Sequence, residues 1–259
     1  MPQAMIAAAL TSGGVIGIVL GLVGGGGSIL AVPLLVYVVG VASPHAAIGT
    51  AAVAVAANAA ASLIGHARAG TVKWPCALVF ATAGATGAAI GAEIGKAVDG
   101  KRLLMLFGLL MIGVGLSMLR KRRTVEAPDV RLSRATAATL LPRLLPIGLG
   151  VGLAAGFFGI GGGFLIVPGL MLATAMPLKN AVGTSLVVVT ALGLTTAASY
   201  ALSGYVDWLL VGVMILGGIG GSGIGILLGR RLAARKGLLE RLFALTVMTV
   251  GAYVTIGAV

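Results

Sequence analysis

Gly21-Leu-Val-Gly24-Gly-Gly26-Gly27-Ser28-Ile-Leu-Ala-Val-Pro33 is a glycine-rich stretch that this chain uses twice. The second copy is Gly156-Phe-Phe-Gly159-Ile-Gly161-Gly162-Gly163-Phe-Leu-Ile-Val-Pro168, at a constant offset of 135 residues, and seven of the thirteen positions are identical. Glycine inside a helix costs about 1 kcal/mol relative to alanine, so each cluster predicts a break between two helical pieces. We interpret each break as backbone held open for a ligand. The alternative is a glycine-rich helix crossing.

The composition is that of a membrane protein. Of the 259 residues, 59% are apolar and 9% are charged, whereas soluble domains carry about 25% charged residues. No charged side chain occurs between Met1 and Arg68 or between Arg143 and Lys179. These runs far exceed the roughly 20 residues that cross a bilayer, so we expect an all-α, polytopic transmembrane bundle. The net charge of +12 does not indicate a nucleic-acid partner, because the basic residues lie in short loops between apolar segments.

The apolar segments fall into two groups of five. They are expected at 4–22, 28–42, 45–65, 75–95 and 103–119, and again at 144–158, 164–176, 178–203, 208–229 and 242–258. The chain therefore divides into a first membrane repeat at 1–119, a basic linker at 120–143 and a second membrane repeat at 144–259. Ile48-Gly49-Thr50 matches Val182-Gly183-Thr184, and Trp74 matches Trp208, both at an offset of 134. Such an internal duplication is typical of secondary transporters.

The fourth segment of each half carries glycines spaced by four residues. They are Gly87, Gly91 and Gly95 in the first half, and Gly217, Gly221, Gly225 and Gly229 in the second. This spacing places the glycines on one helix face, where a neighbouring helix can approach closely. We interpret both series as packing surfaces.

The basic residues indicate how the chain crosses the membrane. If each glycine stretch lies within a single span, nine Lys and Arg residues fall on either side and there is no bias. If each stretch separates two crossings or forms a hairpin, the segments 66–74, 120–143, 177–180 and 230–241 share a side with fifteen of the 18 basic residues. Basic residues accumulate on the cytoplasmic side. We therefore expect the second arrangement in the cell (inner) membrane, with the linker cytoplasmic, both termini outside and the second repeat inverted.

Inverted repeats would bring the two glycine stretches together from opposite faces of the membrane. A new helix is expected after each stretch, near Ser28 and Gly163, and a helix N-terminus offers unpaired amides and a partial positive charge to an anion. Glycine lets a ligand approach the backbone closely. The hydroxyls of Thr50, Thr184 and Ser185 could turn toward the same ligand, or they could bond their own backbone.

Other polar side chains have two interpretations each. His45 and Lys179 occupy equivalent positions near helix starts, where they could attract anions at a gate or simply snorkel to the interface. His66, Glu93 and Asp207 are candidates for proton coupling, because an ionisable group in the membrane suggests function. All three lie near segment ends, where water is accessible. No catalytic constellation and no metal-ligand spacing occurs in the sequence, so we expect no enzyme activity, no metal and no cofactor.

Two glycine-rich stretches ending in proline, each followed by a Gly-Thr-Ala or Gly-Thr-Ser helix, resemble the TauE/SafE family of membrane permeases. The likeness spans essentially the whole chain. The family motif falls on Gly24, Gly26, Gly27, Pro33, Gly49 and Thr50, and on Gly159, Gly161, Gly162, Gly163, Pro168, Lys179, Gly183, Thr184 and Ser185. The first half departs from the second at Ser28 and Ala51, which stand where the second half has Gly163 and Ser185.

The resemblance implies transport of sulfur-containing anions such as sulfite or organosulfonates. We expect a secondary transporter, and more specifically an exporter, that works by alternating access around a midplane anion site. The alternatives are an anion channel, an uptake permease for another organic or inorganic anion, and a membrane assembly protein that transports nothing. The expected partners are a small anion and the lipid bilayer, with a coupling proton or sodium ion and a homo-oligomer as open alternatives.

Overall fold

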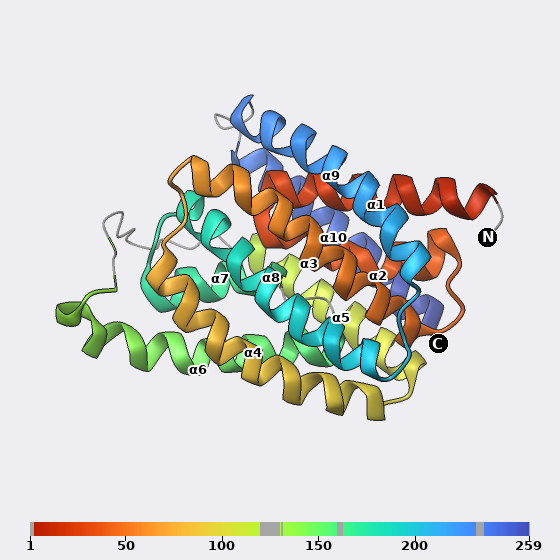
Figure 1. Cartoon of the computed structure of the whole chain (residues 1–259), viewed down its shortest axis with the longest axis horizontal. Helices are drawn as coiled ribbons and strands as arrows, with labels where there is room; N and C mark the ends of the chain where they lie inside the picture. Colours follow the sequence, from red (N-terminus) through yellow and green to blue (C-terminus); the bar gives the residue numbers. More distant parts are fainter. Residues whose placement is uncertain (1–2, 120–129, 131, 160–162, 232–235, 259) are drawn as a thin grey trace.

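The structure is a computed structural model that describes residues 3–119, 130, 132–159, 163–231 and 236–258, and these residues form helices and no strands (Figure 1). The first half contains α1 (Gln3–Val23), the 3-10 segment η1 (Gly24–Leu30), α2 (Ala31–Pro33), the π-helical segment η2 (Leu34–Val39), α3 (Pro44–Arg68), α4 (Trp74–Ala97) and α5 (Gly100–Leu119). The second half contains α6 (Arg134–Phe158), α7 (Gly163–Thr174), α8 (Leu178–Leu202), α9 (Trp208–Arg231) and α10 (Lys236–Ala258). Within these residues, seven helices are long and apolar enough to cross a membrane, which confirms the predicted polytopic helical bundle.

The first helix of the second half begins earlier than the apolar segment that we expected from residue 144. We expected a linker until residue 143, but α6 begins at Arg134. The backbone N–H of Ser133 donates to the hydroxyl of Thr136 at 2.9 Å, which stabilises a helix start at this point. Pro142 and Arg143 fell within the expected linker, yet both lie inside the helix. The remaining predicted segments agree with the observed helices to within a few residues at most ends, although α10 begins six residues before the expected 242.

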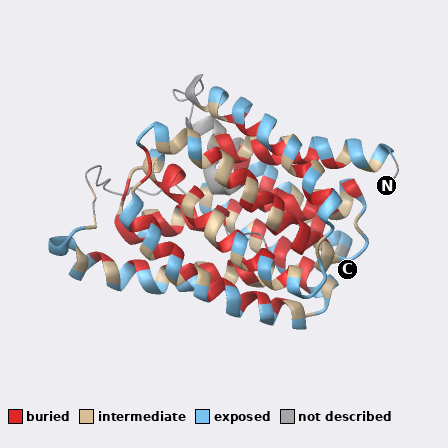
Figure 2. Ribbon diagram, viewed as in Figure 1, coloured by how far each residue is buried: buried red, intermediate tan, exposed pale blue. Residues whose placement is uncertain are grey.

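The two halves are interleaved. α1 of the first half packs most extensively on α9 of the second, and α4 packs on α6 in the same way. α3 pairs with α8, and α5 pairs with α10. In Figure 2 the buried residues concentrate toward the middle of the bundle. α3 and α8 are the most buried of the seven candidate spans, since 67% of an 18-residue apolar stretch in each is buried.

Glycines allow the backbones to touch where α1 meets α9 and where α4 meets α6. A Cβ atom added at Gly87 or Gly91 on α4 would overlap the carbonyl oxygens of Leu149 and Leu153 on α6. Gly221 on α9 stands in the same relation to the carbonyl oxygen of Gly14 on α1. The interpretation of these glycine series as packing surfaces is therefore confirmed. Gly229 is the exception, because a Cβ atom added there would lie 3.8 Å from its nearest neighbours, an ordinary contact distance.

The segments that follow the two glycine stretches pack against the helices that precede them, because η1 contacts α1 and α7 contacts α6. Gly27 in η1 is buried against the backbone of Val19 and Leu20, near the end of α1. After α6, Gly159 adopts a left-handed conformation with φ 65°, which glycine tolerates at a helix end. The segments at the two stretches differ, because the second half continues as one regular helix, α7, whereas the first half continues as η1, α2 and η2.

The connections lie at two opposite ends of the bundle. Figure 1 shows the start of α1, the end of α10 and the loops 40–43, 98–99 and 203–207 on the right, and we call this the terminal end. The loops 69–73 and 175–177 lie on the left with the last turn of α5 and the first turn of α6, and we call this the basic end.

Candidate functional site

Thr50 on α3 binds a loop of the other half. Its hydroxyl oxygen accepts a hydrogen bond from the backbone N–H of Asp207 at 3.1 Å, just before α9 begins. The preceding residue, Gly49, lies so close to the same loop that an added Cβ would overlap the carbonyl oxygen of Tyr205. We call Gly49, Thr50 and the loop 203–207 the terminal clasp.

Thr184 on α8 repeats this arrangement at the opposite end. Its hydroxyl oxygen accepts from the backbone N–H of Lys73 at 3.0 Å, just before α4 begins. An added Cβ at Gly183 would overlap the side chain of Thr71. We call Gly183, Thr184 and the loop 69–73 the basic clasp. Both threonines have an exposed fraction of 0%, so neither hydrogen bond competes with bulk water.

The segments that follow the two glycine stretches meet inside the bundle. η1 packs against α7, and both contact α8. Gly159 lies against the side chain of Ile48, two residues before Thr50 on α3. Ser28, Pro33 and Gly163 are buried and Pro168 is half-buried. Gly24 and Gly26 lie within η1, whereas Gly161 and Gly162 fall outside the described residues.

Ser185 bonds its own helix. Its hydroxyl donates to the carbonyl oxygen of Val182 at 2.8 Å. This is one of the two interpretations that the sequence allowed for it. A hydroxyl that donates one hydrogen bond can still accept another.

His45 and Lys179 lie at opposite ends of the bundle and have unequal surroundings. His45 is half-buried in the terminal end, with its ring centroid 5.5 Å from that of Tyr205 and 6.4 Å from that of Tyr200. Lys179 is exposed at the basic end. Its neighbour Asn180 donates to the carbonyl oxygen of Thr71 at 3.0 Å and so reinforces the basic clasp.

The three candidates for proton coupling all have local partners. His66 Nδ1 lies 3.2 Å from the hydroxyl of Thr71. Glu93 forms an ion pair with Lys96 at 2.8 Å, and its carboxylate also accepts from Ser199 at 2.8 Å. Asp207 accepts from the N–H of Leu210 at 3.0 Å and so caps α9. These contacts give each residue a structural role, and a role in proton movement stays a prediction.

Sequence reasoning missed Tyr200, Tyr205 and Lys96. Tyr200 is completely buried on α8, beside the terminal clasp. The 134-residue offset could have found it, because Tyr200 is the equivalent of His66 and Tyr205 is the equivalent of Thr71. No sequence pattern points to Lys96, because its contacts are with Ser199 and Tyr200 on α8 and form only in the folded chain.

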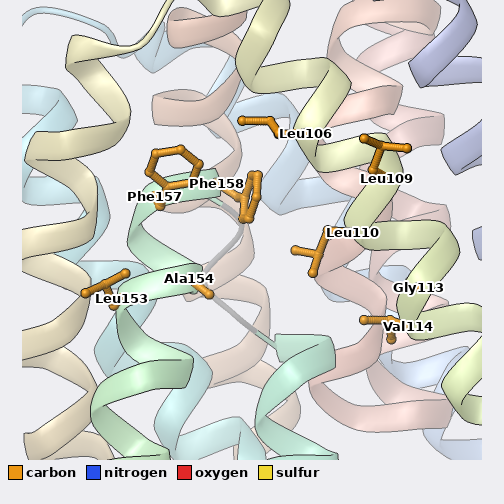
Figure 3. Close-up of a pocket in the computed structure, with 9 residues that line it drawn as sticks. All are labelled: Leu106, Leu109, Leu110, Gly113, Val114, Leu153, Ala154, Phe157 and Phe158. Atoms are coloured by element: carbon orange, nitrogen blue, oxygen red, sulfur yellow. The ribbon is translucent and has the colours of Figure 1, made fainter.

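A hollow at the surface has the wrong chemistry for an anion. It has a volume of about 620 Å³ and lies between α5 and α6 (Figure 3). Its lining side chains are all apolar and come from Leu106, Leu109, Leu110, Gly113, Val114, Leu153, Ala154, Phe157 and Phe158. A metal site is also unsupported, because no group of three His, Cys, Asp or Glu side chains gathers within the described part of the chain.

The bundle of long apolar helices defines a multi-pass membrane protein. The family model "Sulfite exporter TauE/SafE" matches residues 9–254, and the chain belongs to that family. A "Probable membrane transporter protein" of Xylella fastidiosa (strain 9a5c) is 54% identical over 94% of this chain and 92% of its own length. "Probable membrane transporter protein YunE" of Bacillus subtilis (strain 168) is 29% identical over 85% of this chain and 89% of its own length. No solved structure matches the chain.

Proposed function

We propose that this protein is a secondary transporter that exports small sulfur-containing anions, such as sulfite or organosulfonates, by alternating access. The family and its transporter relatives support the class. The observation that carries the mechanism is the pair of clasps, in which Thr50 and Thr184 occupy equivalent positions yet hold loops at opposite ends of the bundle.

The contacts between helices support two inverted repeats. Exchanging each helix for its equivalent turns the α1–α9 contact into the α6–α4 contact, and both contacts are extensive. The α3–α8, α5–α10 and η1–α7 contacts each map onto themselves. A two-fold relation in the membrane plane has these properties. It also places equivalent clasps at opposite ends, as alternating access requires.

The anion site would lie where η1 and α7 meet. Glycine amides after each reversal and the first turn of α7 would supply hydrogen-bond donors and a partial positive charge. Backbone of this kind is tolerated in a membrane only when protein or a wet cavity surrounds it. The buried position of Ser28 and Gly163 fits that requirement.

The clasps would act as gates. With both hydrogen bonds formed, the anion is closed off from either side. Release of the terminal clasp would open the outer side, and release of the basic clasp would open the inner side. Release of the terminal clasp breaks the Thr50–Asp207 hydrogen bond, and release of the basic clasp breaks the Thr184–Lys73 and Asn180–Thr71 hydrogen bonds. Each bond costs about 1 kcal/mol to break.

The membrane potential supports export. An inside-negative potential favours outward movement of an anion by about 2.3 kcal/mol per charge per 100 mV. Uptake would therefore need a coupled proton or sodium ion, whereas export proceeds without one.

Reconstitution into liposomes tests the proposal. Radiolabelled sulfite, thiosulfate, sulfate and a sulfonate should be compared for saturable flux, and the same anions for thermal stabilisation of the detergent-solubilised protein. We expect saturable transport and stabilisation by at least one sulfur anion. Thr82→Val is a control variant that should transport as the wild type does, because Thr82 is exposed and its hydroxyl bonds its own helix at Val79. Flux that grows linearly with concentration would indicate a channel, and stabilisation by no anion would refute the proposal.

A further inference from the structure

Three rings gather at the terminal end of the bundle. The ring centroids of His45 and Tyr205 are 5.5 Å apart, those of Tyr200 and Tyr205 are 6.2 Å apart, and those of His45 and Tyr200 are 6.4 Å apart. They come from the start of α3, the last turn of α8 and the loop that follows it. The cluster thus joins one half of the chain to the other directly beside the terminal clasp.

Two polar atoms in this cluster are buried without a hydrogen-bond partner. Tyr200 has an exposed fraction of 0%, and its hydroxyl makes no hydrogen bond. The Nδ1 atom of His45 is likewise buried and unpartnered. Buried polar groups in native proteins are nearly always satisfied by protein, water or a ligand, so these two atoms from adjacent rings have the capacity to bind the oxygens of an anion.

The charged side chains of Lys96 and Glu93 beside the cluster neutralise each other. The ammonium group of Lys96 lies 6.0 Å from the ring centroid of Tyr200, with its side chain only 15% exposed. It is bonded to Glu93 at 2.8 Å and to Ser203 at 2.9 Å, so the pair of Lys96 and Glu93 adds no net charge. Recognition therefore depends on the phenol, on the imidazole and on the partial positive charge at the start of α3.

The cluster lies on a line from the terminal end to the second glycine stretch. The Cβ of Tyr200 is 3.0 Å from the Cβ position of Gly49, which precedes the clasp residue Thr50. Ile48, one residue earlier, contacts Gly159. These contacts link the base of the Tyr200 side chain, through Gly49 and Ile48, to the second glycine stretch.

We propose that Tyr200 and His45 form a second anion-binding site, an access site for sulfur oxyanions at the terminal end. The phenol would donate to one oxygen of the anion and the imidazole to another, and the faces of the rings would accommodate the carbon part of an organosulfonate. This inference rests on the proposed transport function and adds a site separate from the glycine stretches.

The opposite end has different chemistry. The equivalents of Tyr200, Tyr205 and His45 are His66, Thr71 and Lys179. His66 Nδ1 already contacts the Thr71 hydroxyl, and Lys179 is exposed. The access site is therefore a property of the terminal end, and the two ends bind the same anion unequally.

Tyr200→Phe tests the access site, because it removes only the unpartnered hydroxyl. Sulfite should be titrated by thermal stabilisation in detergent and by initial flux in liposomes, beside Tyr253→Phe, which alters an exposed ring on α10. We expect the half-saturating sulfite concentration to rise about tenfold for Tyr200→Phe, as for the loss of a hydrogen bond to a charged group, and to stay unchanged for Tyr253→Phe.

His45→Gln gives a second measurement that does not alter the tyrosine, and we expect it also to weaken half-saturation. If the wild type responds to sulfite and both variants match it, the access site is refuted while the transport function stands. If the wild type responds to no sulfur anion in either assay, the transport function itself fails and the access site fails with it.

Discussion

Thr184 and Lys73 lie 111 residues apart in the chain, yet the hydroxyl oxygen of Thr184 accepts a hydrogen bond from the backbone N–H of Lys73 at 3.0 Å. Thr50 and Asp207 form the equivalent bond at the other end of the bundle at 3.1 Å. Each half of the protein therefore carries the residue that closes the other half's loop. A change in one clasp need not disturb the other, and this independence can be measured.

The two threonines should control opposite ends of the bundle. Ala51 and Ser185 are buried, equivalent positions, each one residue after its threonine, and each can be replaced by a reporter cysteine. Thr50→Val should make the cysteine at position 51 more accessible to water, and Thr184→Val should do the same for the cysteine at position 185. With Cys76 replaced by Ala, we expect the labelling rate with a water-soluble maleimide to rise about fivefold at the matching reporter, as for loss of about 1 kcal/mol.

The matched controls are the crossed combinations, Thr50→Val with the reporter at Ser185 and Thr184→Val with the reporter at Ala51. Their labelling should stay at the wild-type rate or fall. Equal increases at both reporters would show that the hydroxyls only stabilise the bundle.

Backbone contact between α4 and α6 should tolerate no side chain at Gly152. Its Cβ would overlap the carbonyl oxygen of Gly84, whereas a Cβ at Gly150 on the same helix meets open space. We expect Gly152→Ala to destabilise the protein by about 1–3 kcal/mol, as overpacking does, and Gly150→Ala to have no such effect. Thermal unfolding in detergent compares the two, and equal melting temperatures would contradict the close crossing.

Removing an unsatisfied amide should stabilise the core. Asn58 has an exposed fraction of 0%, neither its Oδ1 nor its Nδ2 makes a hydrogen bond, and it packs on Gly218. The equivalent residue, Leu192, packs on Gly84 in the same way, so leucine fits this position. We expect Asn58→Leu to raise the free energy of unfolding by about 1–2 kcal/mol.

Leu192→Asn is the reverse control and should lower stability. Should Asn58→Leu instead abolish transport at unchanged stability, the amide would be a ligand for the solute or for a coupling ion.

The orientation in the membrane predicts which loops can be labelled from outside intact cells. The loop 203–207 lies at the terminal end and the loop 69–73 at the basic end (Figure 1). In the Cys76→Ala background, a cysteine at Ser203 should react with an impermeant maleimide in intact cells. A cysteine at Gly70 should react only after permeabilisation. The opposite pattern would place the basic end outside and contradict the positive-inside assignment.

The sequence predicted the helices far better than the partners of their side chains. Long apolar runs and basic loops were enough for the bundle, because the membrane restricts the chain to helices of known length. The start of α6 was missed because its first residues were assigned to the basic linker at 120–143, while the contact between Ser133 and Thr136 that starts the helix is local and weak in sequence.

The hydroxyls show the limit of such prediction most clearly. Thr50 and Thr184 were singled out from the sequence, with either a ligand or their own backbone as the expected partner. The structure gives each a loop of the other half, a contact that depends on how the two halves cross. Tyr200 was overlooked because a tyrosine in an apolar helix is ordinary until its hydroxyl is found without a partner.

The glycine crossings have a consequence for synthesis of the chain. α1 is sealed by α9 and α4 by α6, so the first five segments emerge from the ribosome with their tightest contact surfaces still facing lipid. The N-terminal half must wait in the bilayer, inserted but unassembled, until its C-terminal counterpart arrives. A nascent chain arrested after α5 should accordingly be a substrate for membrane quality-control proteases, whereas two separately expressed halves could rescue each other.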